Sequence, residues 1–401
     1  MSENFDIVID RRNTWSTKWG HNEKNPEQED LLAMWIADMD FLSPAAVAKA
    51  ITKQVEHGVF GYFDIPDSCL EATINWSNNR YNWEIKKEWL VYSPSVSTSI
   101  KTAIEVFTNP GDKILIQPPV YAYFRYNIEN SNRQVVVNPL QLHNGSYTID
   151  FEDLERKLSA GVKMFIFCSP HNPVGRVWTV DELDKIANLC STYNVTLVSD
   201  EAHSDLIFDN YKHTPIASLS SETAHNTITF ISPAKTFNLS GLATSFAIIP
   251  RSDYKKEFFT RLVRTGANKA NIFGIAAVEA AFSHGEEWLE NLLEYLQENL
   301  EILMKYISEN IPIIKVIKAE GTYLIWLDCR ELGLQADELN QFIINTAKVV
   351  LDDGSHCGTE GTGFLRINIA CPKSVLLEAL RRIENAVNEL TKSRAVYNDY
   401  V

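Results

Sequence analysis

The chain has 401 residues, 45% of them hydrophobic and 22% charged, which is typical of a globular protein with room for two domains. With 37 Lys and Arg against 52 Asp and Glu, the formal net charge of -15 would repel a nucleic-acid backbone. The opening MSENFDIVIDRRNTW has no basic stretch leading into an apolar one, and no apolar run has the length of a membrane span. The composition therefore excludes disorder, and it predicts a cytoplasmic protein with no nucleic-acid or membrane partner.

Short β-rich runs alternate with helical patterns between about residues 89 and 250. The runs, each bounded by Pro, Gly, Asn or Asp, are WLVYS, KILIQ, QVVVN, MFIFCS, TLVS, TITFIS and SFAII. Helix starts are indicated by Ser43 as N-cap before Pro44, and by Thr179 with Glu182, which have the spacing of a capping box. The alternation predicts an α/β fold in which crossover helices cover a mostly parallel sheet.

The pattern changes after Gly285. A long charged helix is predicted over 286–310, followed by the strands IKVIKA and TYLIWLD and by a closing helix at about 373–392. We therefore expect three parts, which are an N-terminal arm joining the smaller domain (1–42), a large α/β domain (43–285) and a smaller α+β domain (286–401).

The six cysteines are scattered along the chain without a CxxC pair. They are Cys69, Cys168, Cys190, Cys329, Cys357 and Cys371. This spacing indicates neither a zinc site nor a disulfide framework, so we expect reduced thiols and no bound metal.

Polar residues of three kinds follow three of the predicted strands. Asn172 comes after MFIFCS, Asp200 after TLVS and Lys235 after TITFIS. Ligands of an open α/β sheet bind beyond the carboxyl ends of the strands, so these side chains should meet at one edge. An isolated lysine is usually a solvated surface group, but beside a carboxylate it can form a Schiff base with an aldehyde cofactor whose ring nitrogen the aspartate keeps protonated. The three residues therefore predict pyridoxal 5'-phosphate as the cofactor.

Several segments resemble those of a known family. SPHNPVGRVW, VSDEAHSDL and SPAKTFNLSGL are similar to segments of fold type I pyridoxal-phosphate enzymes, specifically the MalY/PatB group of cystathionine (cysteine-S-conjugate) β-lyases. MWIADMDF, VFGYFDIP, QPPVYAYF and GFLRINIACP resemble the same group, and the resemblance runs from about residue 5 to 392. Each motif alone occurs by chance, whereas their order and spacing together are specific.

The resemblance implies roles for the matching positions. Lys235 would be the catalytic Schiff-base lysine, and Asp200 would pair with the pyridinium nitrogen. Asn172 would donate to the phenolic oxygen of the cofactor, and Tyr121 would stack on its ring. His203 is placed with the cofactor-binding residues and outside the catalytic set, and the alternatives are a residue that supports the cofactor contacts from behind or a satisfied core histidine.

The cofactor phosphate needs hydrogen-bond donors. The helix predicted to begin near Val96 and Ser97 offers free N–H groups, and Ser232 adds a hydroxyl. The resemblance implies that Tyr62 reaches the phosphate of the other subunit, so that a homodimer shares its active sites. Without the family, Tyr62 would be interpreted as a packed core tyrosine.

The substrate is expected to contact Arg366, which lies among apolar residues in GFLRINIACP, where a charge needs a carboxylate partner. By resemblance that partner is the α-carboxylate of the substrate, held bidentately, and a structural salt bridge to Asp or Glu is the alternative. Ala37 and Asp38 in MWIADMDF would border the substrate site.

Three positions depart from the family pattern and leave the shape of the pocket open. Ser95 stands where a glycine is common before the phosphate-binding turn, Ala234 where a serine is common, and Cys357 where an aromatic residue is usual. The chain also has no basic residue soon after Lys235, unlike many aminotransferases of this fold, and this agrees with the MalY/PatB group.

The resemblance implies a C–S β-lyase that converts L-cystathionine or related L-cysteine S-conjugates into a thiol, pyruvate and ammonia by α,β-elimination. Lys235 would carry the cofactor and then act as the base that removes the Cα proton. An aminotransferase, which uses the same carbanion, is the alternative enzyme. A regulatory protein on this fold is disfavoured because the following residues are all present: Lys235, Asp200, Tyr121, Asn172 and Arg366.

Overall fold

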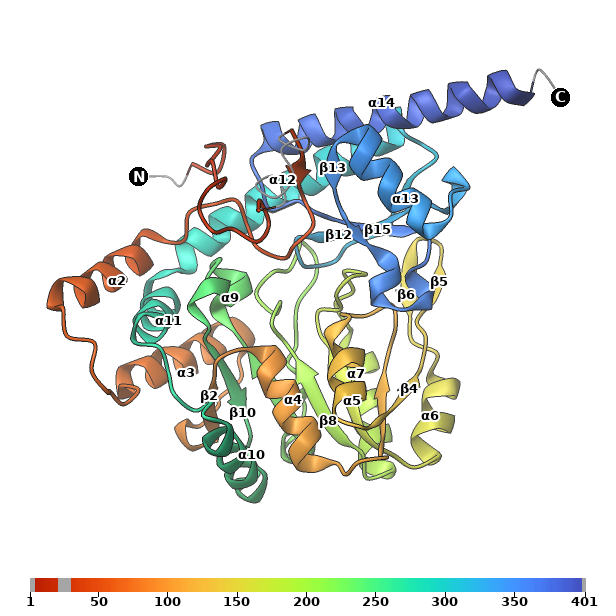
Figure 1. The fold of residues 1–401 in the computed structure, drawn as a ribbon. Helices are drawn as coiled ribbons and strands as arrows, with labels where there is room; N and C mark the ends of the chain where they lie inside the picture. Colours follow the sequence, from red (N-terminus) through yellow and green to blue (C-terminus); the bar gives the residue numbers. More distant parts are fainter. Residues whose placement is uncertain (1–3, 21–29, 399–401) are drawn as a thin grey trace.

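The computed structural model describes residues 4–20 and 30–398 (Figure 1). Its largest sheet has seven strands in the order β2-β10-β9-β8-β7-β3-β4. Their bounds are β2 (Leu90–Ser93), β3 (Lys113–Ile116), β4 (Gln134–Val137), β7 (Val162–Cys168), β8 (Thr196–Asp200), β9 (Thr227–Ile231) and β10 (Ser245–Ile248). β10 is antiparallel to both of its neighbours, and the other pairs are parallel. The seven predicted strands and the mostly parallel sheet are confirmed.

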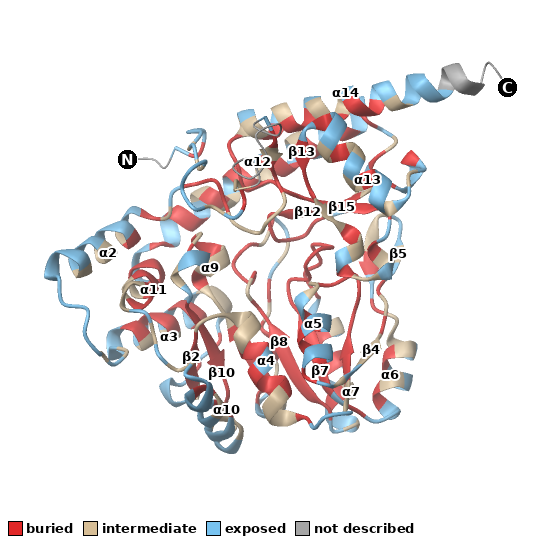
Figure 2. Ribbon diagram, in the orientation of Figure 1, coloured by how far each residue is buried: buried red, intermediate tan, exposed pale blue. Residues whose placement is uncertain are grey.

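Helices cover both faces of this sheet, whose strands are largely buried (Figure 2). Alternate residues of β7 show the two faces: Phe165 and Phe167 pack in one buried cluster, whereas Met164 and Ile166 pack in another. The first cluster includes side chains of α6 (Phe151–Ser159) and α7 (Val180–Thr192). The second includes side chains of α4 (Val96–Phe107), α5 (Tyr123–Asn130) and α10 (Ser252–Thr265). Because both faces are covered, a ligand must approach the sheet at an edge.

The predicted helix starts are correct in one case and wrong by one residue in the other. At α7 the Thr179 side chain accepts from the Glu182 N–H, and the Glu182 carboxylate accepts from the Thr179 N–H, so the capping box is confirmed. The helix predicted after Ser43, α2 (Ala45–His57), has Pro44 as its N-cap rather than as its first residue. The Ser43 hydroxyl instead donates to the Asn238 carbonyl oxygen at 3.3 Å, because the packed fold brings this acceptor within reach.

A smaller antiparallel sheet has the order β11-β12-β15-β14, and in Figure 1 it lies above the large sheet. Its strands are β11 (Lys315–Val316), β12 (Leu324–Asp328), β14 (Asp352–Asp353) and β15 (Phe364–Asn368). The run IKVIKA thus contributes only two strand residues. Two long helices accompany this sheet, which are α12 (Glu286–Asn310), with the predicted bounds, and α14 (Lys373–Asn398), which ends beyond the predicted residue 392.

The N-terminal segment is joined to the C-terminal part by a short parallel pairing of β1 (Leu32–Ala33) with β13 (Val349–Val350). The boundaries proposed at residues 42 and 285 stay a prediction. The other α-helices and strands of the described residues are α3 (Asp67–Tyr81), β5 (Gln141–His143), β6 (Ser146–Thr148), α8 (Ser221–Asn226), α9 (Pro233–Thr236), α11 (Ile272–His284) and α13 (Ala336–Phe342). None of the helices in the described ranges combines the length and the apolar character that a bilayer crossing needs.

Candidate functional site

A hollow of about 1030 Å³ opens at the carboxyl ends of the parallel strands, between this edge, residues 35–37 and the β14–β15 region. The register places Cys168 of β7 opposite Asp200 of β8, and Asp200 opposite Phe230 of β9, so the three strands end at one level. The lining contains all but two of the residues predicted as site residues. The predicted site residues that line the hollow are Ala37, Val96, Ser97, Tyr121, Asn172, Asp200, His203, Ser232, Lys235 and Arg366. The structure therefore brings together the three polar groups that the strand pattern placed at one edge.

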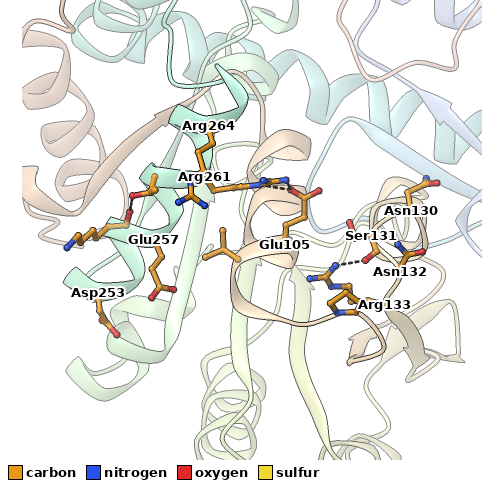
Figure 3. Close-up of a pocket in the computed structure, with 13 residues that line it drawn as sticks. Glu105, Asn130, Ser131, Asn132, Arg133, Asp253, Glu257, Arg261 and Arg264 are labelled. Carbon is orange, nitrogen blue, oxygen red and sulfur yellow. Dashed lines mark hydrogen bonds and ion pairs between the residues drawn. The ribbon is translucent and has the colours of Figure 1, made fainter.

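A second hollow, of about 830 Å³, lies on the surface beside α4 and α10 (Figure 3). Arg261 donates two hydrogen bonds to the Glu105 carboxylate there, and Arg133 donates to the Ser131 carbonyl oxygen. The part of its lining that the structure describes includes none of the predicted site residues. We therefore place the candidate site in the first hollow, which contains Lys235.

Lys235 lies in α9, a helix of four residues that directly follows β9. The helix starts here because Pro233 suits the first turn and the Ser232 Oγ caps it by accepting from the Ala234 N–H at 3.2 Å. Lys235 Nζ donates to the Ala37 carbonyl oxygen at 2.6 Å. Burial in the hollow, which is only partly opposed by the charge of Asp38, lowers the pKa of Lys235 to about 8. At pH 7 most of this amine is therefore still protonated, but its neutral, nucleophilic fraction is far larger than that of a lysine with the ordinary pKa.

Two further titratable groups face the hollow from the end of β8 and the turn after it. Burial raises the pKa of Asp200 to about 6, although its carboxylate accepts from the Ala202 N–H at 3.1 Å. Burial, together with the positive charge of Lys235, lowers the pKa of His203 to about 3, so this imidazole is neutral. Its Nδ1 is buried and has no hydrogen-bond partner among the described residues. A cation next to Asp200 would stabilise the carboxylate, as a protonated ring nitrogen would do.

The N-terminus of α4, where we expect an anion to bind, lies in the same hollow. Val96 and Ser97, its first two residues, line the hollow, and the first N–H groups of a helix have no partner within the helix. Ser95 caps this helix, since its Oγ accepts from the Thr98 N–H at 3.1 Å. The Ser232 hydroxyl already donates to the Thr244 carbonyl oxygen at 2.9 Å, so the phosphate contact predicted for Ser232 would require it to leave this partner.

An aromatic ring and an amide complete the lining near Asp200. Tyr121 lies in the turn between β3 and α5, where its N–H donates to the Asn172 carbonyl oxygen at 3.1 Å and its ring stacks on Tyr123 with a centroid distance of 5.3 Å. The Asn172 Oδ1 accepts from Arg366 at 3.0 Å, so the amide nitrogen is the group left to donate. Together the hollow offers an amine, a buried carboxylate, an aromatic ring, an amide donor and the N-terminus of a helix. This donor set fits pyridoxal phosphate, which has an aldehyde, a ring nitrogen, a phenolic oxygen and a phosphate.

Comparisons with known proteins agree with this arrangement. The sequence model of the aminotransferase class I and II family matches residues 29–383. The chain is 41% identical to the cystathionine beta-lyase PatB of Bacillus subtilis (strain 168) over 386 residues, which are 96% of this chain and 100% of PatB. The chain belongs to the aminotransferase class I and II family, in the MalY/PatB group.

Two further proteins are similar over nearly the whole chain. Protein MalY of Escherichia coli (strain K12) is 31% identical, and the match covers 96% of this chain and 98% of MalY. A crystal structure of a pyridoxal phosphate-bound protein from Clostridium difficile 630, described as an aminotransferase, is 46% identical and has a TM-score of 0.94. It matches 96% of this chain and 100% of its own chain. The predicted fold type I architecture is confirmed.

Two residues predicted from the family pattern do not line the hollow. The Asp38 carboxylate is held by Arg11, at 2.8 Å for Oδ2 and 3.1 Å for Oδ1, so it borders the site through its charge and not through a lining side chain. Tyr62 lies in the segment between α2 and α3 with its side chain fully exposed, so the alternative of a packed core tyrosine is wrong. Asp38 lies beside Arg11 because the N-terminal segment packs over residues 34–41, a contact that no local pattern indicates.

Three residues near the site have no signal in the sequence pattern. The Asp352 carboxylate forms an ion pair with Arg366, so the alternative of a structural salt bridge is present in the structure. The Tyr323 hydroxyl donates at 3.2 Å to the same Ala37 carbonyl oxygen that accepts from Lys235. The buried Asp205 accepts from Thr236, the neighbour of Lys235, at 2.6 Å, and thereby ties the turn after β8 to α9. All three act across distant segments, which is why sequence spacing does not identify them.

Proposed function

We propose that this protein is a pyridoxal phosphate-dependent C–S β-lyase that acts on L-cystathionine or related L-cysteine S-conjugates. The observation that carries the proposal is the 41% identity to PatB along nearly the whole of both chains. The reaction cleaves the Cβ–S bond by α,β-elimination. One conjugate and one water then yield a thiol, pyruvate and ammonium, so no external oxidant or reductant is needed.

The residues of the hollow would hold the cofactor as follows. Lys235 Nζ would bind its aldehyde carbon, and the N–H groups at the start of α4 would bind its phosphate. Asp200 would keep a proton on the ring nitrogen, Asn172 would donate to the phenolic oxygen, and the Tyr121 ring would cover one face of the pyridine. When bound, pyridoxal phosphate supplies an electron sink for the pair left at Cα after proton removal.

Two side chains of the hollow would orient and deprotonate the substrate. Arg366 would bind the α-carboxylate and so set the position of the Cα–H bond. Lys235 Nζ would take the Cα proton, and its pKa of about 8 leaves enough neutral amine near pH 7 to 8 for this step. The Ala37 carbonyl oxygen, which accepts from Nζ at 2.6 Å, would keep the amine directed into the hollow.

The assay that tests the proposal follows pyruvate and free thiol together. Purified holoenzyme is incubated with L-cystathionine and with several S-alkyl cysteines, with and without an added 2-oxoacid. We expect pyruvate and thiol in equal amounts, at a rate that the 2-oxoacid does not change. Turnover that depends on the 2-oxoacid and releases no thiol would instead identify an aminotransferase, which the family model also includes.

We also propose a cytoplasmic homodimer in which Tyr62 serves the active site of the partner. The six cysteines are unpaired and buried, which suits a reducing compartment. Val59, Phe60 and Tyr62 form an exposed apolar segment, and Tyr62 does not line the hollow of its own chain. An apolar segment of this kind is expected to be covered by another surface.

Mixing two impaired variants, at a cofactor concentration that leaves Tyr62→Phe unsaturated, tests this arrangement. Tyr62→Phe should weaken cofactor binding by about 10-fold or more, since a hydrogen bond to a charged phosphate is lost. Dimers formed from Tyr62→Phe and Lys235→Ala subunits should regain activity, because one of their sites combines Lys235 from one subunit with Tyr62 from the other. Tyr126→Phe, a change of another exposed tyrosine, serves as the control and should bind cofactor normally. A fully active monomer in solution would refute the shared site.

A further inference from the structure

Arg366 is already occupied by protein groups before a substrate is present. Its Nη1 donates to Asn172 Oδ1 at 3.0 Å, and its Nη2 donates to the Trp35 carbonyl oxygen at 3.2 Å. The same Nη2 lies 2.5 Å from Asp352 Oδ2, a charge-assisted contact. Within the described part of the chain, Nε is buried and has no partner. Three of the five N–H groups of the guanidinium are thus directed at protein acceptors, which leaves Nε–H and the second N–H of Nη1, and Asp352 neutralises the charge.

Asp352 reaches Arg366 because the two residues are paired across β14 and β15. The Arg366 side chain is 8% exposed and that of Asp352 is 19% exposed, so the carboxylate stands at the border between the hollow and solvent. On its other side, Asp352 Oδ1 lies 3.5 Å from Nδ1 of His356, whose side chain is 64% exposed. The carboxylate thus has a second possible partner outside the buried part of the site.

A substrate carboxylate must compete with Asp352 for this guanidinium. Bidentate binding uses two parallel N–H groups, and Nε–H is parallel to one N–H of Nη2. Nε is unpartnered, but the two N–H groups of Nη2 are directed to Trp35 and Asp352. Two carboxylates on one guanidinium repel each other, and this repulsion is strong where water is excluded. Binding of the substrate is therefore coupled to release of Asp352.

We propose that Asp352 is an internal carboxylate that occupies Arg366 in the free enzyme and exchanges with the α-carboxylate of the substrate. Asp352 thereby sets the affinity of the site for amino acids. When its carboxylate leaves Arg366, His356 is the side chain that pairs with it. This inference rests on the proposed function, because it assumes that Arg366 binds the substrate carboxylate. It makes Asp352 a residue that weakens substrate binding, whereas a purely orienting partner of Arg366 would strengthen it.

The chain offers a matched control in the adjacent residue. Asp353 also lines the hollow and also carries a carboxylate, but its Oδ1 accepts from the Ser355 N–H at 2.8 Å. Asp352→Asn and Asp353→Asn therefore remove the same charge from the same lining. Only the first removes the ion pair with Arg366, so comparing the two variants separates exchange at Arg366 from the general electrostatic field of the hollow.

The experiment measures the dissociation constant of L-alanine for the holoenzyme from the absorbance change of the bound cofactor. L-Alanine has the α-amino and α-carboxylate groups and no β leaving group, so binding is observed without elimination. We expect Asp352→Asn to lower this dissociation constant at least about 5-fold, whereas Asp353→Asn changes it less than about 2-fold. For ethylamine, which has no carboxylate, the wild type, Asp352→Asn and Asp353→Asn should have the same dissociation constant.

Several outcomes would overturn the exchange. One is that Asp352→Asn binds L-alanine no more tightly than the wild type. Another is that Asp353→Asn gains as much affinity for L-alanine, and a third is that Asp352→Asn gains as much affinity for ethylamine. If Asp352→Asn does not fold, Asp352→Ser removes the charge from a smaller side chain and is judged by the same values. A wild-type holoenzyme that keeps its cofactor but responds to no L-amino acid would refute the proposed function itself, which distinguishes the two failures.

Discussion

Replacing Lys235 with alanine should reduce turnover by at least about a thousandfold, because the variant loses both the amine that binds the cofactor aldehyde and the base that takes the Cα proton. The wild-type protein should be yellow as purified, and the variant should lose this colour on dialysis. Borohydride reduction of the wild-type protein should attach the cofactor covalently, and mass spectrometry should find it on the peptide that contains Lys235. Pyruvate release from L-cystathionine measures the turnover.

The control for this variant is another lysine of the chain. Lys256 lies in the surface hollow beside α10, away from the candidate site, and Lys256→Ala should keep both colour and turnover. Burial lowers the pKa of Lys235 to about 8, so this lysine should react as a nucleophile near neutral pH. Wild-type activity in Lys235→Ala would show that the lysine is wrongly assigned.

Replacing Arg366 with alanine should reduce kcat/KM for L-cystathionine by about 30-fold or more, while the cofactor spectrum stays unchanged. The physical reason is the loss of a buried, charge-assisted partner of the α-carboxylate, worth about 2–5 kcal/mol. Arg366→Lys keeps a positive charge without the planar fork, so it should fall between the alanine variant and the wild type. Steady-state kinetics and a cofactor absorbance spectrum, recorded on the same preparations, measure the two effects separately.

Arg261 provides a matched arginine for this comparison. It forms an ion pair with Glu105 in the surface hollow, so Arg261→Ala also removes a guanidinium from a carboxylate. Arg261→Ala should leave kcat/KM for L-cystathionine unchanged. If Arg366→Ala loses bound cofactor, or keeps a near-normal kcat/KM, then Arg366 is structural and the substrate carboxylate is held elsewhere, with Asn172 and the backbone near Ala37 as the next candidates.

Short-range patterns are sufficient to place most elements of this fold. The strand runs are apolar and bounded by residues that interrupt strands, and the capping box of Thr179 and Glu182 joins two residues that are three positions apart. Such features depend on the nearest neighbours in the chain alone. The common edge of Asn172, Asp200 and Lys235 also follows from the sequence, because parallel strands end at the same edge of a sheet.

Contacts between distant segments depend on the packed fold. Ser43 donates to Asn238 rather than capping α2, Asp38 is paired with Arg11, and Asp352 is paired with Arg366. Lys235 Nζ likewise finds its acceptor at Ala37, 198 residues earlier in the chain. A buried polar group takes whichever partner lies within hydrogen-bond distance, and that distance is determined by how helices and sheets pack. Periodicity and spacing describe neighbours along the chain, so they indicate which groups need partners but not which partners the tertiary structure supplies.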